Sequence, residues 1–301
     1  MNMETNDVKF EPAPSKLNKR IFSSIPVAFI LMWSSGAIFV ELGLKSTEPL
    51  TFLALRLLIS MAIMWLISLW IRPAFPQTVS EWRDILITGL FLQAGYQSFF
   101  FYALANQVSP GLLAIILGTQ PILTAILSKT KTSLSQWIGL ILGIIGLTLV
   151  VADSIFVGKI SVIGVVSAVL SMLSITSGTF LQKKTTASQP VNMAIQYTGS
   201  AIILIIMASF FEHFTVHWTV SFVIALGWMV LIVSVGATML LYLMIRQGAL
   251  TNVTSLFYCV PPVTALLDYF IFGHILHPIV ILGMAFIIVG LIIINRQGRT
   301  P

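Results

Sequence analysis

Charged residues are scarce in this chain. Lys, Arg, Asp and Glu make up 9% of the 301 residues, whereas hydrophobic residues make up 57%. A globular domain carries about 25% charged residues, so this chain has too few to cover a water-facing surface of its size. The deficit excludes an ordinary water-soluble domain and predicts an integral membrane protein.

Several chemical groups are also missing. Cys259 is the single cysteine, so an intrachain disulfide is excluded. No GxxxxGK[ST] motif is present, and Phe214 stands where a zinc-protease motif beginning at His213 needs glutamate. The acidic residues lie mostly in the first segment and in loops. We therefore expect no catalytic residue, no metal and no cofactor, and the net charge of +6 accompanies no nucleic-acid-binding motif.

Long apolar segments are abundant. A helix needs about 20 apolar residues to cross a bilayer. The predicted spans are about 21–42, 50–71, 83–104, 109–128, 134–152, 161–182, 191–211, 219–245, 251–272 and 277–295. The sequence therefore predicts an all-α membrane protein with ten transmembrane helices.

Basic residues lie mainly on one side of these spans. The predicted cytoplasmic segments contain Lys9, Lys16, Lys19, Arg20, Arg72, Arg83, Lys129, Lys131, Lys183, Lys184, Arg246, Arg296 and Arg299. External loops contain Lys45 and Lys159, and Arg56 lies inside a span. Because positive charge accumulates on the cytoplasmic side, we expect both termini there, with a flexible tail at 1–20 and another at 296–301.

The chain repeats itself. The stretch GTQPILTAILS at 118–128 shares proline, threonine, alanine and leucine with YCVPPVTALLD at 258–268, at an offset of 140 residues. Tyr102 recurs at the same offset as Tyr242, and glycines 139 and 146 recur as 283 and 290. Two five-helix halves, 21–152 and 161–295, share the pattern. Because five is odd, the second half must enter the membrane inverted.

Three stretches carry a family resemblance: LMWSSGAIFVELGL, EPLTFLALR and LANQVSPGLLAIILGTQPILTAILS. The sequence resembles the EamA group of the drug/metabolite transporter superfamily along 21–295. The resemblance implies a ten-helix inner-membrane permease that exports an amino acid, another metabolite or a drug by alternating access. Its implied partners are a small-molecule substrate, the lipid bilayer and a coupling ion such as H⁺. Both monomer and homodimer remain open.

Polar residues inside the spans are candidates for a site. Gln93 and Gln97 lie four residues apart and share a helix face; they either line a cavity or join helices as hydrogen-bonding groups. Trp33 lies far from the membrane interfaces, next to Ser34, and is a candidate wall of a site. Ser174 belongs to a stripe of small residues on the sixth span, which favours close helix packing or a polar cavity wall.

Arg56 is a charged residue within a predicted membrane span. It lies about 9 Å from the start of its helix, at a rise of 1.5 Å per residue. An intramembrane arginine pairs with an acid or faces water. We therefore expect a structural pair with Glu41, a side chain that extends to water at the membrane surface, or contact with an anionic substrate group. Asp268 has two interpretations, as an interfacial cap or as a proton-coupling group.

Pro121, Pro261 and Pro262 lie within predicted helices, where proline removes a backbone hydrogen bond. They mark either packing kinks or hinges.

The candidate substrate-binding residues are Trp33, Ser34, Arg56, Gln93, Gln97, Gln120, Ser174 and Tyr258. The leading hypothesis is a secondary transporter. The alternatives are a polytopic membrane enzyme that acts on lipid and a membrane receptor or scaffold without transport activity.

Overall fold

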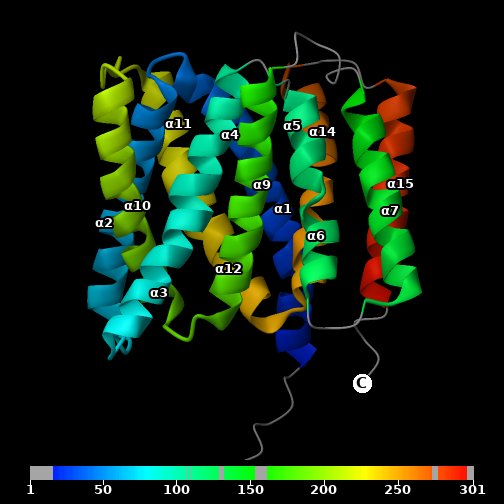
Figure 1. The fold of residues 1–301 in the computed structure, drawn as a ribbon, viewed down its shortest axis with the longest axis horizontal. Coiled ribbons are helices and arrows are strands. Elements are labelled where there is room, and N and C mark those ends of the chain that lie inside the picture. The colour runs from blue at the N-terminus through cyan, green and yellow to red at the C-terminus, as the bar shows by residue number, and fades with distance from the viewer. Residues whose placement is uncertain are drawn as a thin grey trace, which may run out of the picture.

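The protein is all-helical. The computed structural model describes residues 16–106, 108, 110–128, 132–152, 161–272 and 277–296, and these ranges contain helices and no strand beyond one isolated bridge between Thr47 and Val216. The helices stand side by side between an upper and a lower face (Figure 1). The all-α prediction is confirmed.

The first part of the chain forms α1 (Lys16–Leu44), α2 (Pro49–Ile71), α3 (Val79–Gly89), η1 (Leu90–Gly95), α4 (Tyr96–Ala105), α5 (Pro110–Gly118), α6 (Gln120–Leu127) and α7 (Leu134–Val150). The second part forms α9 (Val162–Lys184), α10 (Gln189–Phe211), α11 (Val220–Trp228), η2 (Met229–Ala237), α12 (Thr238–Gln247), α13 (Leu250–Ser255), η3 (Leu256–Cys259), α14 (Val260–Phe272) and α15 (Pro278–Arg296). Because α1 already begins at Lys16, the predicted N-terminal tail is helical in its last residues.

Six of the described helices are long and apolar enough to cross a membrane: Ser24–Leu44, Pro49–Ile71, Val162–Lys184, Gln189–Phe211, Val220–Gln247 and Leu250–Leu267. Three shorter apolar helices coincide with other predicted spans: Leu112–Leu127, Leu134–Val150 and Pro278–Ile294. The remaining predicted span, 83–104, falls within the continuous helical stretch α3, η1 and α4. These helices are those of an integral membrane protein.

Two of the helical stretches widen in the middle. η1 and η2 are π-helical segments between α-helical ends, and such segments leave backbone carbonyls without their usual partners. Two serines of α9 bind carbonyls at η1 and just beyond it. Ser174 donates to Phe91 O at 2.9 Å, and Ser171 donates to Tyr96 O at 2.8 Å. The small-residue stripe of α9 therefore packs against the widened helix and satisfies its backbone.

The regular α-helical geometry is interrupted just before the predicted hinge prolines. The α-helix is interrupted at Thr119, between α5 and α6, and Pro121 occupies the first turn of α6. The 3₁₀ segment η3 ends directly before α14, whose second and third residues are Pro261 and Pro262. Proline fits the first turn of a helix, where its missing N–H needs no partner.

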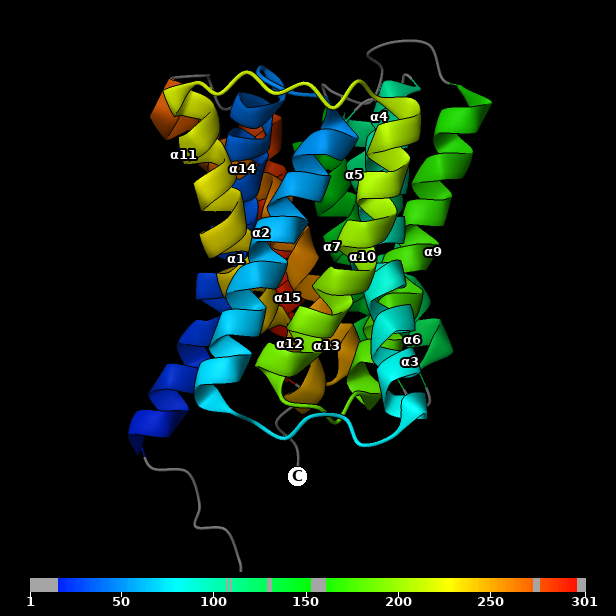
Figure 2. The same ribbon diagram turned by 90° about the vertical axis from the view of Figure 1, so that its left-hand side faces the viewer.

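Helices α2 and α10 lie side by side and run in opposite directions (Figure 2). Glu212, directly after α10, accepts hydrogen bonds from the backbone N–H groups of Leu50 and Thr51 at 2.7 Å each. A carboxylate at a helix N-terminus is favourable because the free N–H groups and the helix dipole are positive there. These bonds hold the C-terminus of α10 against the N-terminus of α2.

Helices α7 and α15 pack so closely that their backbones touch. A methyl group added to Gly146 would lie 2.6 Å from Gly283 O, and one added to Gly139 would lie 2.7 Å from Gly290 O. Gly143 packs against the ring of Tyr258, where an added methyl group would lie 2.5 Å from a ring carbon. The face of α7 that carries Gly139, Gly143 and Gly146 is therefore covered within the chain itself.

Candidate functional site

A small cavity lies among helices from both parts of the chain. Its lining residues are Trp33, Leu92, Gln93, Tyr96, Ile175, Thr179, Thr238, Leu241, Tyr242 and Phe257. They come from α1, η1, α4, α9, α12 and η3. The cavity volume is about 20 Å³, and a single water needs about 10–15 Å³ measured in this way. In this conformation the cavity therefore holds about one water molecule.

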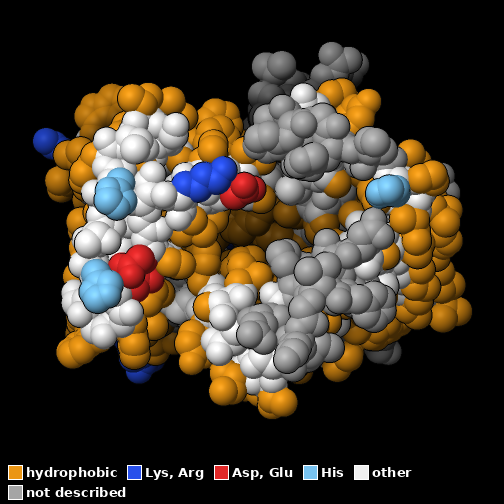
Figure 3. All heavy atoms as spheres, turned by 90° about the horizontal axis from the view of Figure 1, so that it is seen from above, with side chains coloured by type: hydrophobic (Ala, Val, Ile, Leu, Met, Phe, Trp, Pro, Cys, Tyr) orange, Lys and Arg blue, Asp and Glu red, His pale blue; other side chains and the backbone are white. Residues whose placement is uncertain are grey.

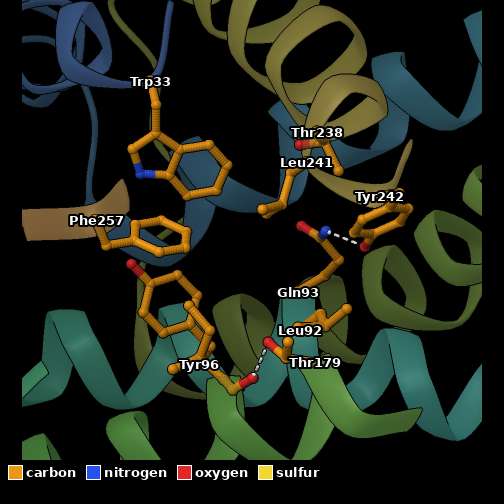
Figure 4. Close-up of a pocket in the computed structure, with 10 residues that line it drawn as sticks. Trp33, Leu92, Gln93, Tyr96, Thr179, Thr238, Leu241, Tyr242 and Phe257 are labelled. Atoms are coloured by element: carbon orange, nitrogen blue, oxygen red, sulfur yellow. Dashed lines mark hydrogen bonds between the residues drawn. The ribbon is translucent and has the colours of Figure 1, made fainter. Parts of the chain in front are cut away.

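One side of the cavity is aromatic. The ring centroids of Trp33 and Phe257 lie 5.5 Å apart at an interplanar angle of 83°, and Phe29 packs behind them at 5.4 Å from Trp33. Tyr96 lies beyond Phe257 on the same side (Figure 4). Such surfaces bind apolar groups, rings or organic cations.

The opposite side is polar. Gln97 Nε2 donates to Gln93 Oε1 at 3.0 Å, and Gln93 Nε2 donates to the Tyr242 hydroxyl at 3.0 Å (Figure 4). Tyr242 in turn donates to Gln196 Oε1 at 2.7 Å. All four side chains are buried. The prediction that Gln93 and Gln97 share one helix face is confirmed by their mutual hydrogen bond.

The chain of hydrogen bonds continues away from the cavity. Gln196 Nε2 donates to Gln182 Oε1 at 2.7 Å and to Asn192 Oδ1 at 2.9 Å. The network thus links η1 and α4 to α12, α10 and α9, which follow much later in the chain. Buried polar networks are stable when every member is paired, so this one fixes the relative positions of the five elements.

Seen from the upper face, the molecule is hollowed in the middle, and hydrophobic side chains form the floor of the hollow (Figure 3). At the upper end of α1, Lys45 and Glu41 form an ion pair at 3.6 Å and are 66% and 71% exposed. Glu41 was our expected partner for Arg56. That expectation was wrong, because the Glu41 carboxylate is exposed and pairs with Lys45, directly after the end of α1.

The predicted candidates occupy several places. Trp33 and Gln93 line the cavity. Gln97 lies one hydrogen bond away, and Gln120 Nε2 donates at 3.4 Å to Thr179, which lines the cavity. The remaining candidates do not line it.

Those remaining candidates lie at helix contacts. The Ser34 carbonyl accepts from Thr264 at 3.2 Å, whereas the buried Ser34 hydroxyl has no partner among the described residues. Tyr258 donates to Leu140 O at 3.4 Å. Ser174 supports η1. Arg56 is 7% exposed, and its Nε donates to Ser234 Oγ at 2.8 Å. The side chain of Asp268 lies outside the described part of the structure.

Most residues of the cavity wall were not predicted from the sequence: Leu92, Tyr96, Ile175, Thr179, Thr238, Leu241, Tyr242 and Phe257. One signal was available, because Tyr242 is the repeat counterpart of Tyr102. The repeat does not reveal which copy faces the interior. Tyr102 is 55% exposed and Tyr242 is 1% exposed.

Apolar helices that enclose a partly polar cavity are typical of membrane transporters. The chain belongs to the EamA-like transporter family, whose model matches residues 24–152 and 162–296. It is therefore a membrane transporter, with a small-molecule substrate and the lipid bilayer as its partners.

Similar proteins are also named as transporters. The chain is 26% identical over 291 residues to the uncharacterized transporter YvbV of Bacillus subtilis, covering 90% of each chain. It is 24% identical over 275 residues to the uncharacterized inner membrane transporter YedA of Escherichia coli K12, covering 89% of this chain and 88% of the other. One protein of known crystal structure shares the fold at a TM-score of 0.78 and 18% identity, covering 93% of this chain and 98% of that chain.

Proposed function

We propose that this protein is a secondary transporter that exports a small metabolite across the inner membrane by alternating access. The substrate is an amino acid, a related compound or a drug. Ten membrane-crossing helices form two inverted repeats, 21–152 and 161–295, and the site lies between them. One observation carries the proposal: the cavity wall combines Trp33 and Gln93 from the first repeat with Thr179, Tyr242 and Phe257 from the second.

The packing of counterpart helices supports the inverted repeat. In the sequence, Gly139 corresponds to Gly283 and Gly146 to Gly290. In space, the pairs are exchanged, with Gly139 against Gly290 and Gly146 against Gly283. A two-fold axis in the membrane plane produces this exchange. The counterparts α2 and α10 likewise run in opposite directions.

A difference between the two repeats supports two access states. Thr264 and Thr124 are counterparts, 140 residues apart. Thr264 Oγ1 donates to Ser34 O on α1, whereas the Thr124 hydroxyl is buried without a hydrogen-bond partner among the described residues. One repeat thus makes a contact that the other lacks. Exchange of the two arrangements would convert the protein to a state open to the opposite face.

The small volume of the cavity supports movement during transport. A space for about one water cannot hold a metabolite, so helices must separate for substrate to bind. The hollow in the upper face gives a route of approach from that side (Figure 3). The helix interruptions before Pro121 and Pro261 are the proposed hinges.

We place both termini in the cytoplasm on the basis of the basic residues described above. The beginning of α1 and the end of α15 lie at the lower face (Figure 1). In this orientation the hollow faces outward. Transporters of the EamA family are in general not enzymes, and we propose that this chain catalyses no covalent reaction.

Counterflow in proteoliposomes tests the proposal. Vesicles that contain the purified protein and a mixed pool of amino acids, other metabolites and drugs are diluted into isotope-labelled pool, and mass spectrometry identifies compounds that enter. We expect at least one small metabolite to exchange faster than in protein-free vesicles. An imposed pH gradient tests coupling to H⁺ in the same vesicles. Folded protein that exchanges no compound in the pool would contradict the proposal.

A further inference from the structure

Arg56 carries a charge in the interior of the protein. It lies on α2, about 10 Å beyond the helix start at 1.5 Å per residue. The side chain is 7% exposed, so the guanidinium does not extend to water at the membrane surface. Charges in this position are costly unless they are paired or perform a function.

Among the described residues, the groups that interact with the guanidinium are hydroxyl groups, and none is an acid. Its Nε donates to Ser234 Oγ at 2.8 Å. The hydroxyls of Tyr197 and Tyr96 lie close enough to interact with it electrostatically. No carboxylate among the described residues forms an ion pair with Arg56, and Glu41 pairs with Lys45 instead. A positive charge is therefore held without a negative partner.

Neighbouring elements fix the position of this charge. Tyr197 on α10 donates to Ser234 O, in the π-helical segment η2, while Ser234 Oγ accepts from Arg56. Ser60, one turn along α2, donates to the backbone carbonyl of Arg56 at 2.7 Å. The π-helical geometry of η2 places Ser234 at this point. The site is preorganised by three helices rather than held by one flexible side chain.

Tyr96 connects the charge to the cavity. It lines the cavity wall (Figure 4) and also interacts with Arg56. Its hydroxyl has no hydrogen bond to any described residue, whereas the other hydroxyl and amide side chains of the wall, those of Gln93, Thr179, Thr238 and Tyr242, all have one. The cavity wall therefore carries a hydroxyl without a hydrogen-bond partner among the described residues, and the charge of Arg56, which lies outside the wall, acts on that hydroxyl.

We propose that Arg56 and the Tyr96 hydroxyl form an anion subsite, and that the transported molecule is a small organic carboxylate, amino acids included. This inference rests on the proposed transport function and names its substrate class. The carboxylate binds at Arg56 when the cavity opens, while the uncharged part of the molecule lies against Trp33 and Phe257. A guanidinium matches a carboxylate with two parallel hydrogen bonds, and the surrounding low dielectric strengthens the attraction.

The test uses 3-phenylpropionate and its uncharged amide, 3-phenylpropanamide, as matched probes. Purified protein is titrated with each probe, and the shift in melting temperature gives the apparent affinity. We expect the carboxylate to bind wild type at least tenfold more tightly than the amide. Arg56→Gln and Tyr96→Phe should each weaken carboxylate binding, the first by about ten- to hundredfold as expected for a hydrogen bond to a charged group. Binding of the amide should stay unchanged.

Arg83→Gln is the matched control, because Arg83 is exposed and pairs with Asp84 at 2.9 Å. It should leave the preference intact. If Arg56→Gln does not fold, Tyr96→Phe carries the test. Equal affinity for the two probes in wild type, or an unchanged preference in the Tyr96 and Arg56 variants, overturns the inference.

The result also separates the subsite from the transport function. If counterflow shows exchange of neutral compounds only, the protein is a transporter and the anion subsite is wrong. If the carboxylate binds through Arg56 but no compound exchanges, the subsite stands and the transport proposal fails.

Discussion

Replacement of Tyr242 by phenylalanine should destabilise the protein while it leaves the side-chain volume nearly unchanged. The Tyr242 hydroxyl accepts from Gln93 Nε2 at 3.0 Å and donates to Gln196 Oε1 at 2.7 Å. Hydrogen bonds inside membrane proteins contribute about 0.6 kcal/mol each on average, so loss of two gives about 1.2 kcal/mol. Each buried group that is left without a partner can cost about 1–3 kcal/mol. We therefore expect Tyr242→Phe to lower the free energy of unfolding by about 1–3 kcal/mol.

The repeat supplies a matched control. Tyr102 is the counterpart of Tyr242, but it is 55% exposed and its hydroxyl has no hydrogen bond to any described residue. Tyr102→Phe should change the free energy of unfolding by less than about 0.5 kcal/mol. Equilibrium unfolding in mixed micelles, followed by tryptophan fluorescence, measures both variants. Equal stability of the two variants would refute the claim that the network fixes the relative positions of these helices.

The remaining predictions concern the hinges and the close contact between α7 and α15. Pro121→Ala and Pro261→Ala should each straighten a helix and reduce counterflow more than they reduce the amount of folded protein; wild-type transport by both would leave the prolines as packing kinks. Gly146→Ala should destabilise by about 1–3 kcal/mol through overpacking, because the added methyl group would lie 2.6 Å from Gly283 O. Gly227→Ala, where nothing lies within 4 Å, should be neutral or stabilising in a thermal melt, and equal melting temperatures for the two variants would contradict the packing argument.

Much of the helical fold was predictable from the sequence because apolar length is a local property. The segment 50–71, for example, forms α2 at Pro49–Ile71. The start of α1 was less predictable, since the polar residues from Lys16 onward continue a helix that composition assigns to a tail. Composition reports whether a segment enters the bilayer, whereas the end of a helix depends on its neighbours.

The cavity was only partly predictable. Gln93 and Trp33 stood out because a buried amide and an off-interface tryptophan need an explanation within the membrane. Tyr96 and Phe257 could not be singled out in this way, because aromatic side chains in an apolar chain can equally well face the lipid. Their placement depends on the π-helical segment and the 3₁₀ segment next to them, and these interruptions leave no clear mark in the sequence.

The accessibility of a cysteine in the cavity wall tests alternating access most directly. In a Cys259→Ala background, which removes the single native cysteine, Thr238→Cys places a thiol on the wall. Lys45→Cys, at an exposed position beside Glu41, serves as the one-sided control. A membrane-impermeant thiol reagent is applied to intact cells and to inside-out vesicles. We predict that the cysteine at 238 reacts slowly from both sides and is protected by a transported substrate, whereas the one at 45 reacts from one side. Reaction at 238 from one side alone, with and without substrate, would contradict alternating access through this cavity.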